Sequence, residues 1–203
     1  FPALRAMGEG KGDVIFYLTA KTTTRAAAEE ALERLRQGSP GLHLRSLTLT
    51  AKEKICFLDQ PACMPDRCPY ADGYFDRIKD AVWDGLDRTV FDRAGVQALA
   101  QAHRVCPFEL ALDLSLWCDV SVGDYNHLFD PAASLKRFFE TAGDYLFLID
   151  EAHNLPDRAR EMYSAALCKS RFAEAKKALG KARGKPKTAL HKVDAAMLEL
   201  RRL

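Results

Sequence analysis

Residues 145–155 read YLFLIDEAHNL, and this stretch decides the class of fold. Its first five residues are apolar and lack the alternation of a half-exposed strand. Such a run predicts a fully buried strand of a parallel sheet that helices cover on both faces. Two carboxylates, Asp150 and Glu151, follow the strand directly. Because ligands of open α/β sheets bind beyond the carboxyl ends of the strands, the sequence predicts an α/β fold with a ligand site after residue 149.

The acidic pair has two interpretations. In P-loop nucleotide hydrolases an acid at this position holds Mg²⁺, and a neighbouring acid can orient or activate the attacking water. Asp150 would then be the magnesium ligand and Glu151 the residue that acts on the water. Alternatively, the two acids form a solvated pair on the surface after a core strand.

The composition is that of an ordinary globular protein, with 203 residues of which 48% are hydrophobic and 29% charged. Thirty basic and 28 acidic residues give a net charge of +2, so any surface for nucleic acid must be local. No apolar run approaches the roughly 18 residues of a membrane span, and the N-terminus lacks a signal-peptide pattern. We therefore expect a cytoplasmic protein without membrane association. Residues 1–7 resemble a helix already in progress, which predicts that the chain is a fragment.

Further strands are predicted at residues 14–19, 42–50 and 117–122 from their apolar or alternating patterns. Helices are predicted at residues 25–36, 75–86, 95–104, 135–141, 158–167, 171–179 and 189–203. The glycine-rich turn at residues 8–13 is not predicted to be a phosphate loop. It lacks the G-x-x-x-x-G-K-[ST] pattern and leads into a strand rather than a helix.

Polar residues follow two of the predicted strands. Thr19, Lys21 and Thr22 lead from the first strand into a helix, whose N-terminal N–H groups could bind a DNA phosphate. Simple capping of the helix by the threonines explains the same pattern. Tyr125 and Asn126 lie in a polar turn after residues 117–122, where they could contact nucleic acid or the adjacent acidic motif, or be solvated. If the strands are parallel, both segments share one edge of the sheet with the acidic pair.

Four of the six cysteines are candidates for a shared metal or cluster site: Cys56, Cys63, Cys68 and Cys106. Prolines make the segment around the first three loop-like, and two predicted helices could return the fourth to them. Four cysteines can hold a zinc ion or a [4Fe–4S] cluster. Structural zinc sites usually have paired C-x₂₋₄-C knuckles, and only one near-pair occurs here, which favours the cluster. The other two cysteines are predicted to be packing residues: Cys118 and Cys168.

Asp150-Glu151-Ala152-His153 together with the four cysteines resembles the XPD/DinG-type iron–sulfur DNA helicases of superfamily 2. Residues 17–22 resemble the motif Ia of that family. Cys56 and Cys106 resemble its first and last cluster cysteines, and residues 119–126 resemble the strand and turn that precede its acidic motif. The resemblance covers nearly the whole chain.

The resemblance implies a partial RecA-like parallel sheet of the P-loop NTPase type, with an inserted iron–sulfur domain and the start of a helical arch. Residues 1–52 and 111–157 would form the motor domain, 53–110 the iron–sulfur domain and 158–203 the arch. The implied catalytic residues are Asp150, Glu151 and His153, with Mg²⁺ on Asp150. The implied DNA-binding residues are Thr19, Lys21, Thr22, Tyr125 and Asn126.

Family members use ATP to move 5′ to 3′ on single-stranded DNA, so the implied partners are ATP, single-stranded DNA and forked duplexes, and the implied setting is DNA repair. Two parts of the family pattern, the Walker A loop and the second motor domain, are missing from the sequence. We therefore expect no ATPase activity from this polypeptide alone, although the protein it came from has that activity. A non-enzymatic nucleic-acid-binding module with a Cys₄ zinc site is the main alternative, and a redox iron–sulfur protein unrelated to DNA is a third.

Overall fold

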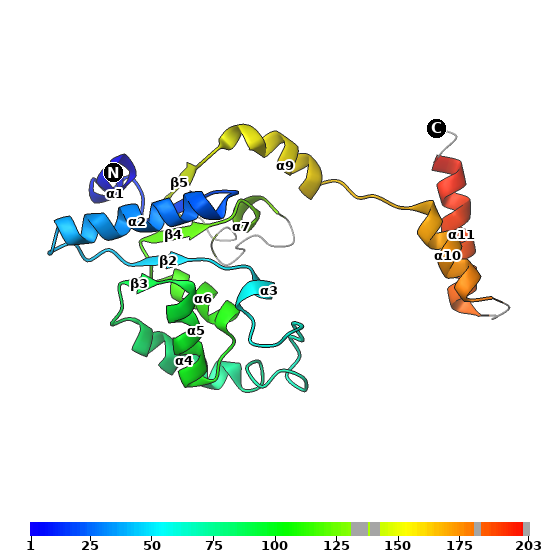
Figure 1. Ribbon diagram of the computed structural model, residues 1–203, viewed down its shortest axis with the longest axis horizontal. Coiled ribbons are helices and arrows are strands. Elements are labelled where there is room, and N and C mark those ends of the chain that lie inside the picture. The colour runs from blue at the N-terminus through cyan, green and yellow to red at the C-terminus, as the bar shows by residue number, and fades with distance from the viewer. Residues whose placement is uncertain (131–137, 139–142, 181–183, 201–203) are drawn as a thin grey trace. The chain divides into compact units, whose positions relative to one another are not determined.

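The computed structural model describes residues 1–130, 138, 143–180 and 184–200. It divides into two units, Phe1–Met162 and Tyr163–Leu203. The strands of the first unit are β1 (Val14–Leu18), β2 (Ser46–Thr48), β3 (Val90–Phe91), β4 (Val120–Gly123) and β5 (Tyr145–Ile149). Its helices are α1 (Pro2–Gly8), α2 (Thr22–Gly38), α3 (Lys52–Ile55), α4 (Tyr74–Gly85), α5 (Arg93–His103), α6 (Pro107–Ser115), α7 (Asn126–Phe129), the 3₁₀ turn η1 (Ala152–Asn154) and α9 (Leu155–Met162) (Figure 1).

Among the described residues, five strands form one all-parallel sheet in the order β3-β2-β4-β1-β5. β1 lies between two neighbours, so that Ile15 pairs with Val120 of β4 on one side and with Leu146 of β5 on the other. Because all the strands run in the same direction, their carboxyl ends meet at one edge of the sheet. The prediction of an α/β fold with a parallel sheet is confirmed.

Helices cover both faces of the sheet. Successive side chains of β1 point to opposite faces, and the apolar ones on each face are buried under helices. Ile15 packs on one face with Leu32 of α2. Phe16 and Leu18 pack on the other face with α4, α5 and α6, where Val96 is fully buried. Figure 1 shows α1 and α2 on one side of the strands and α4 to α6 on the opposite side. Each fully buried aliphatic side chain of these two cores contributes about 1.5–3 kcal/mol of burial free energy.

The position of β5 corrects one expectation. The strand is parallel, as predicted, but in the described part of the chain it pairs only with β1 and forms the edge of the sheet. Phe147 and Leu148 are 39% and 40% exposed, so the strand is not fully buried. Phe147 is partly shielded from solvent by β1, because its ring stacks on that of Phe16 with the centroids 5.7 Å apart. An apolar run therefore indicates a strand without telling whether both of its edges are paired.

Several element boundaries also differ from the predictions. The strand predicted at residues 42–50 is confined to β2, and β3 and α6 were not predicted. The helix predicted at residues 135–141 lies outside the described residues, apart from residue 138. No described helix combines the length and the apolar character needed to cross a bilayer.

The second unit contains α10 (Lys169–Ala178) and α11 (Lys185–Leu200). Asp194 of α11 lies 3.5 Å from Lys176 and 3.9 Å from Lys169, both in α10. These ion pairs connect the two helices across their interface, and their partial exposure to water makes each of them weak.

Candidate functional site

The carboxyl ends of β4, β1 and β5 carry the polar residues that the sequence predicted for a site. The backbone N–H of Thr19 donates to the carbonyl of Gly123 at 3.0 Å, and that of Asp150 donates to the carbonyl of Leu18 at 2.9 Å. The sheet hydrogen bonds thus continue one residue past the ends of β1 and β5. This brings the segment after β1 and the acidic pair after β5 to adjacent positions on the sheet edge.

Glu151 is the centre of the contacts at this edge. Its backbone has φ 51° and ψ 41°, a left-handed conformation that turns the chain from β5 into η1. Its carboxylate accepts hydrogen bonds from Lys21 Nζ at 3.1 Å and from Asn154 Nδ2 at 3.3 Å. His153 Nε2 lies 3.5 Å from the same carboxylate. The structure therefore brings together two predicted catalytic residues and one predicted DNA-binding residue.

Lys21 is the main cause of a shift in the pKa of Glu151. Its hydrogen bond and its positive charge hold the pKa of Glu151 below the ordinary value, with smaller contributions in the same direction from His153 and Asn154. Glu151 is ionised at neutral pH, as a glutamate with the ordinary pKa would also be. A carboxylate in this state can accept a proton or orient a water molecule, as the prediction requires.

Thr19 lies in the turn before α2, whereas Thr22 lies in the helix itself. Thr19 is 1% exposed, and its hydroxyl oxygen accepts a hydrogen bond from the backbone N–H of Lys21 at 3.2 Å. The hydroxyl is thus engaged within the turn, where it helps to orient Lys21. Thr22 is the first residue of α2. Direct contact of either threonine with DNA stays a prediction.

Tyr125 is fully buried, which the sequence did not indicate. Its hydroxyl has no hydrogen-bond partner among the described residues. Burial raises the pKa of Tyr125, and the nearby charges of Asp150, Glu151 and Asp124 raise it further. The neighbouring Asn126 donates its backbone N–H to Asp124 Oδ1 at 3.0 Å, closing the turn after β4. The Tyr125 side chain is thus buried close enough to Asp150 and Glu151 to feel their charges, and its predicted contact with DNA remains untested.

Sequence reasoning also missed His127, which follows the same turn. The side chain is buried, and Nδ1 accepts the backbone N–H of Asp124 at 3.0 Å. Burial lowers the pKa of His127, so the imidazole is neutral and can act as this acceptor. A Cβ at Gly123 would lie only 2.9 Å from Nδ1, which explains the glycine at the end of β4.

The four candidate cysteines lie in the part of the first unit that precedes α6. Cys68 is buried, Cys56 and Cys106 are partly buried, and Cys63 is exposed. Burial is the main cause that raises the pKa of Cys106. In the part of the chain that the structure describes, no three His, Cys, Asp or Glu side chains gather closely enough to hold a metal ion. The structure therefore does not test the cluster on these four cysteines, and the cluster remains a prediction.

The two remaining cysteines differ from each other. Cys118 is buried, and its thiol donates to the carbonyl of Leu114 at 3.3 Å. Burial raises the pKa of Cys118 to about 12, which keeps it protonated and unreactive, as predicted for a packing residue. Cys168 is exposed just before α10, so its prediction as a packing residue was wrong.

A family model described as DEAD_2 matches residues 43–172, which is more than half of the chain. This chain belongs to the DEAD_2 family. The match includes the cysteine segment, the turn after β4 and the acidic pair, but begins after β1 and the Lys21 turn. It confirms the resemblance to the XPD group of superfamily 2 helicases.

Individual relatives of the DEAD_2 chain are distant. It is 32% identical over 89 residues to the Fanconi anemia group J protein homolog of Gallus gallus, covering 44% of this chain and 7% of that protein. It is 25% identical over 142 residues to the General transcription and DNA repair factor IIH helicase subunit XPD of Schizosaccharomyces pombe, covering 66% of this chain and 17% of that protein. It is 29% identical over 87 residues to the Regulator of telomere elongation helicase 1 homolog of Drosophila melanogaster, covering 43% of this chain and 9% of that protein.

The DEAD_2 chain also shares its fold with a solved structure named Truncated XPD. The two align with a TM-score of 0.57 at 19% identity, over 97% of this chain and 56% of that one. The chain therefore spans about half of this structure and less than a fifth of the curated relatives described above.

Proposed function

We propose that this chain forms part of the first motor domain of an ATP-dependent DNA helicase that moves 5′ to 3′ on single-stranded DNA and acts in DNA repair. The observation that carries the proposal is the contact between Lys21 and Glu151 at the carboxyl edge of a parallel sheet. Lys21 lies in the turn predicted to contact DNA, and Glu151 belongs to the acidic pair predicted to act in ATP hydrolysis. Membership of the DEAD_2 family supports the same conclusion.

In this proposal each residue of the acidic segment has its own role. Asp150 holds the Mg²⁺ of MgATP, and Glu151 orients the attacking water. His153 lies beside Glu151 and contributes to its ionisation. The 203 residues contain no G-x-x-x-x-G-K-[ST] motif, so the lysine and the backbone cradle for the phosphates come from outside them. The chain alone is therefore inactive as an ATPase.

Lys21 has two alternative anionic partners in this scheme. Its pair with Glu151 is exposed to solvent, with 58% and 36% of the two side chains accessible, and such pairs are weak. A DNA phosphate that approaches the turn after β1 can therefore replace Glu151 as the partner of Lys21. The exchange offers a direct physical link between DNA binding and the catalytic carboxylate.

We further propose a [4Fe–4S] cluster on Cys56, Cys63, Cys68 and Cys106. Four thiols and their resemblance to the ligands of the family support this assignment, although their positions here do not form a ligand set. Metal sites rarely exist preformed in an unfolded chain, so binding of the cluster and folding of this segment would be coupled. The second unit, with α10 and α11, is proposed as the start of the helical arch.

ATP hydrolysis by the full-length gene product tests the proposal. We expect hydrolysis that single-stranded DNA stimulates, and a loss of about 100-fold in kcat on Glu151→Gln, because the variant cannot accept a proton. Glu30→Gln is the matched control, since Glu30 lies on the exposed surface of α2 and pairs with Arg34. Hydrolysis that survives Glu151→Gln would contradict the assigned role. Zinc without iron in the purified protein would favour the alternative of a zinc-binding module.

A further inference from the structure

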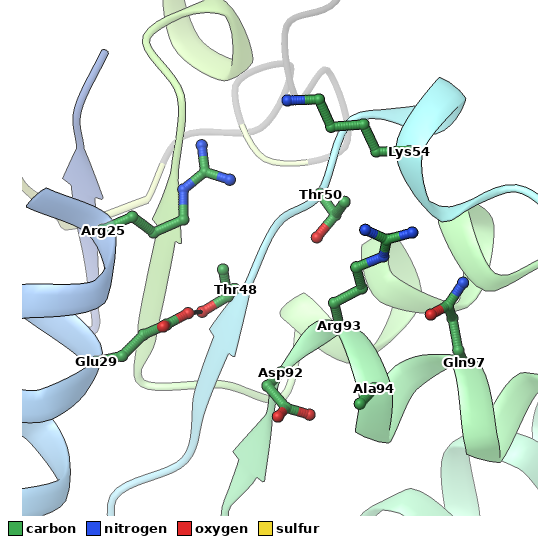
Figure 2. A pocket seen from close by; sticks show the side chains of 9 residues that line it. All are labelled: Arg25, Glu29, Thr48, Thr50, Lys54, Asp92, Arg93, Ala94 and Gln97. Carbon is green, nitrogen blue, oxygen red and sulfur yellow. Dashed lines mark hydrogen bonds between the residues drawn. The ribbon is translucent and has the colours of Figure 1, made fainter. Parts of the chain in front are cut away.

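A cavity of about 530 Å³ opens beyond the carboxyl end of β2 in the first unit (Figure 2). Its walls come from α2, which follows β1 and packs on one face of the sheet, and from α5, which follows β3 and packs on the other. Helices that depart to opposite faces leave a crevice beyond the strand ends, and ligands of open α/β sheets bind in such crevices. The position of the cavity thus follows from the topology of the sheet.

Three cations face this cavity from three different elements. Arg25 comes from α2, Lys54 from α3 and Arg93 from α5. In Figure 2 their charged groups lie at the end of the cavity toward which β2 runs. Neither Lys54 nor Arg93 has an ion-pair partner within the described ranges of the chain. Arg25 donates from Nη1 to the carbonyl of Leu49 at 3.4 Å, while its buried Nε lacks a partner among these residues.

The two carboxylates of the cavity already accept hydrogen bonds from the protein. Glu29 accepts a hydrogen bond from the hydroxyl of Thr48. Asp92 Oδ1 accepts the backbone N–H of Gly95 at 2.7 Å and so caps α5. In Figure 2 both lie toward the end of the cavity opposite the three cations. The cavity therefore has one more positive than negative charge, and the donors at its cationic end are available to an outside anion.

We propose that this cavity binds a backbone phosphate of single-stranded DNA. A phosphodiester carries a single negative charge, which matches the surplus of one positive charge. Arg25 and Arg93 supply planar guanidinium groups that bind phosphate oxygens in a bidentate manner, and Lys54 adds a third cation. Contacts of this kind do not depend on base sequence, as an enzyme that moves along DNA requires.

The inference rests on the proposed function, because it extends the path of the DNA along the sheet edge. β2 is two strands from β1, so the cavity lies about 10 Å along the edge from the turn that holds Lys21. It lies three strands, or about 14 Å, from the end of β5 with Asp150. One DNA strand along the edge can therefore contact both Lys21 and the cavity without occupying the site proposed for ATP.

Binding of fluorescein-labelled dT20 to the 203-residue chain, followed by anisotropy at several NaCl concentrations, tests this inference. Arg93→Gln should weaken binding about fivefold, and the slope of log Kd against log [NaCl] should fall by about 0.7, the value for one phosphate contact on a single strand. Lys54→Gln should act in the same direction. Lys79→Gln is the matched control, because Lys79 is exposed on α4, outside the cavity, and should leave the slope unchanged.

A second pair of variants should shift the affinity in the opposite direction. Glu29→Gln removes a negative charge from the cavity while keeping an acceptor for Thr48, so it should tighten dT20 binding about twofold to fivefold. Glu30→Gln removes the same charge one residue away, outside the cavity, and should have a smaller effect. Circular dichroism of each variant verifies that it is folded.

The outcomes separate this inference from the proposed function. If the wild-type chain binds dT20 and Arg93→Gln and Lys54→Gln behave like Lys79→Gln, the cavity assignment is wrong and the proposed DNA binding stands. If the wild-type chain does not bind dT20, the cavity assignment is wrong, and ATP hydrolysis by the full-length gene product still decides the proposed function. Inorganic phosphate or ATP that displaces dT20 from the wild type, but not from Arg93→Gln, at matched ionic strength would identify a site for free phosphate or nucleotide instead.

Discussion

Lys21 and Glu151 interact across the ends of two neighbouring strands, and Lys21 lowers the pKa of Glu151. Lys21→Met should raise the pKa of Glu151 toward the ordinary carboxyl value, because Lys21 is the largest cause of its depression. Since the folded-state pKa is lowered, the wild-type pair stabilises the fold above the unfolded pKa, and this stabilisation is lost as the pH falls through the folded pKa. In the Lys21→Met variant, the stability of the fold should therefore no longer fall with this contribution as the pH is lowered.

Carbon-13 NMR titration of the glutamate carboxyl groups measures this change. Lys11→Met is the matched control, because Lys11 Nζ lies 2.8 Å from Glu9 and is the main cause that lowers the pKa of Glu9. That variant should shift Glu9 and leave Glu151 unchanged. A Glu151 titration that is insensitive to Lys21→Met would show that the ion pair does not exist in solution.

Tyr125 provides a second prediction at the residue scale. Its buried hydroxyl lacks a partner among the described residues, and an unsatisfied buried hydroxyl costs about 1–3 kcal/mol. Tyr125→Phe should therefore stabilise the protein by about 1 kcal/mol in urea denaturation. Tyr74→Phe should destabilise it by about the same amount, because the hydroxyl of Tyr74 donates to Asp113 Oδ2 at 2.6 Å. Destabilisation by Tyr125→Phe would reveal a partner for that hydroxyl.

At the scale of elements, the packing of α4 against α5 and α6 depends on a glycine. A Cβ at Gly85 would lie 2.9 Å from Leu114 Cδ2 and 3.1 Å from Leu99 Cδ2. Gly85→Ala should therefore destabilise the first unit by about 1–3 kcal/mol in chemical denaturation. Gly8→Ala at the end of α1 should change stability by less than about 0.5 kcal/mol, since a methyl group added there would meet no atom within 4 Å. Equal effects of the two variants would argue against close packing at Gly85.

The segment between α3 and α6 allows a test of the cluster. If Cys63 is a ligand, Cys63→Ser should reduce the iron bound by protein purified without oxygen and weaken the absorption near ~400 nm expected of a [4Fe–4S] cluster. The sheet should remain folded by circular dichroism, because Cys63 lies outside both cores. Cys168→Ser, at an exposed position in the second unit, is the control and should retain the iron. Iron content unchanged in Cys63→Ser would remove this residue from the ligand set.

The elements that sequence reasoning predicted well are those whose apolar residues are contiguous. β1 and β5 are such runs, and each was predicted as a strand from its contiguous apolar residues. The edge position of β5 could not be predicted, because a residue pattern does not say which strands are neighbours. β3 has only two residues, too few to produce a period.

The sequence predicted those parts of the candidate site whose residues are contiguous, and it missed the parts that only the fold brings together. The acidic pair is contiguous in sequence, and its motif is specific enough to be recognised. The cavity beyond β2 draws on residues as far apart as Arg25 and Arg93, which only the fold brings together. The burial of Tyr125 likewise depends on the elements that surround its turn, and the turn sequence alone favoured exposure.

At the scale of the whole molecule, the division into two units predicts where a protease cuts. Residues 163–168 have no helix or strand, and Tyr163 and Leu167 are 73% and 65% exposed. Brief digestion with chymotrypsin should therefore cleave after one of these residues, while Trp83, 75% exposed but within α4, resists. Mass spectrometry identifies the products. The fragment that contains the first unit should unfold at the same urea concentration as the intact chain, and an earlier transition would show that the second unit stabilises it.

The edge position of β5 has a consequence for the behaviour of this polypeptide at high concentration. The outer backbone groups of β5 have no strand partner in the described part of the chain, and its exposed apolar side chains lie beside them. Such an edge is a template for intermolecular β-pairing. We therefore expect pairing through β5 to lower the solubility of the isolated polypeptide at high concentration. A lysine introduced at Leu148 should raise that solubility more than one charge added away from the edge of the sheet.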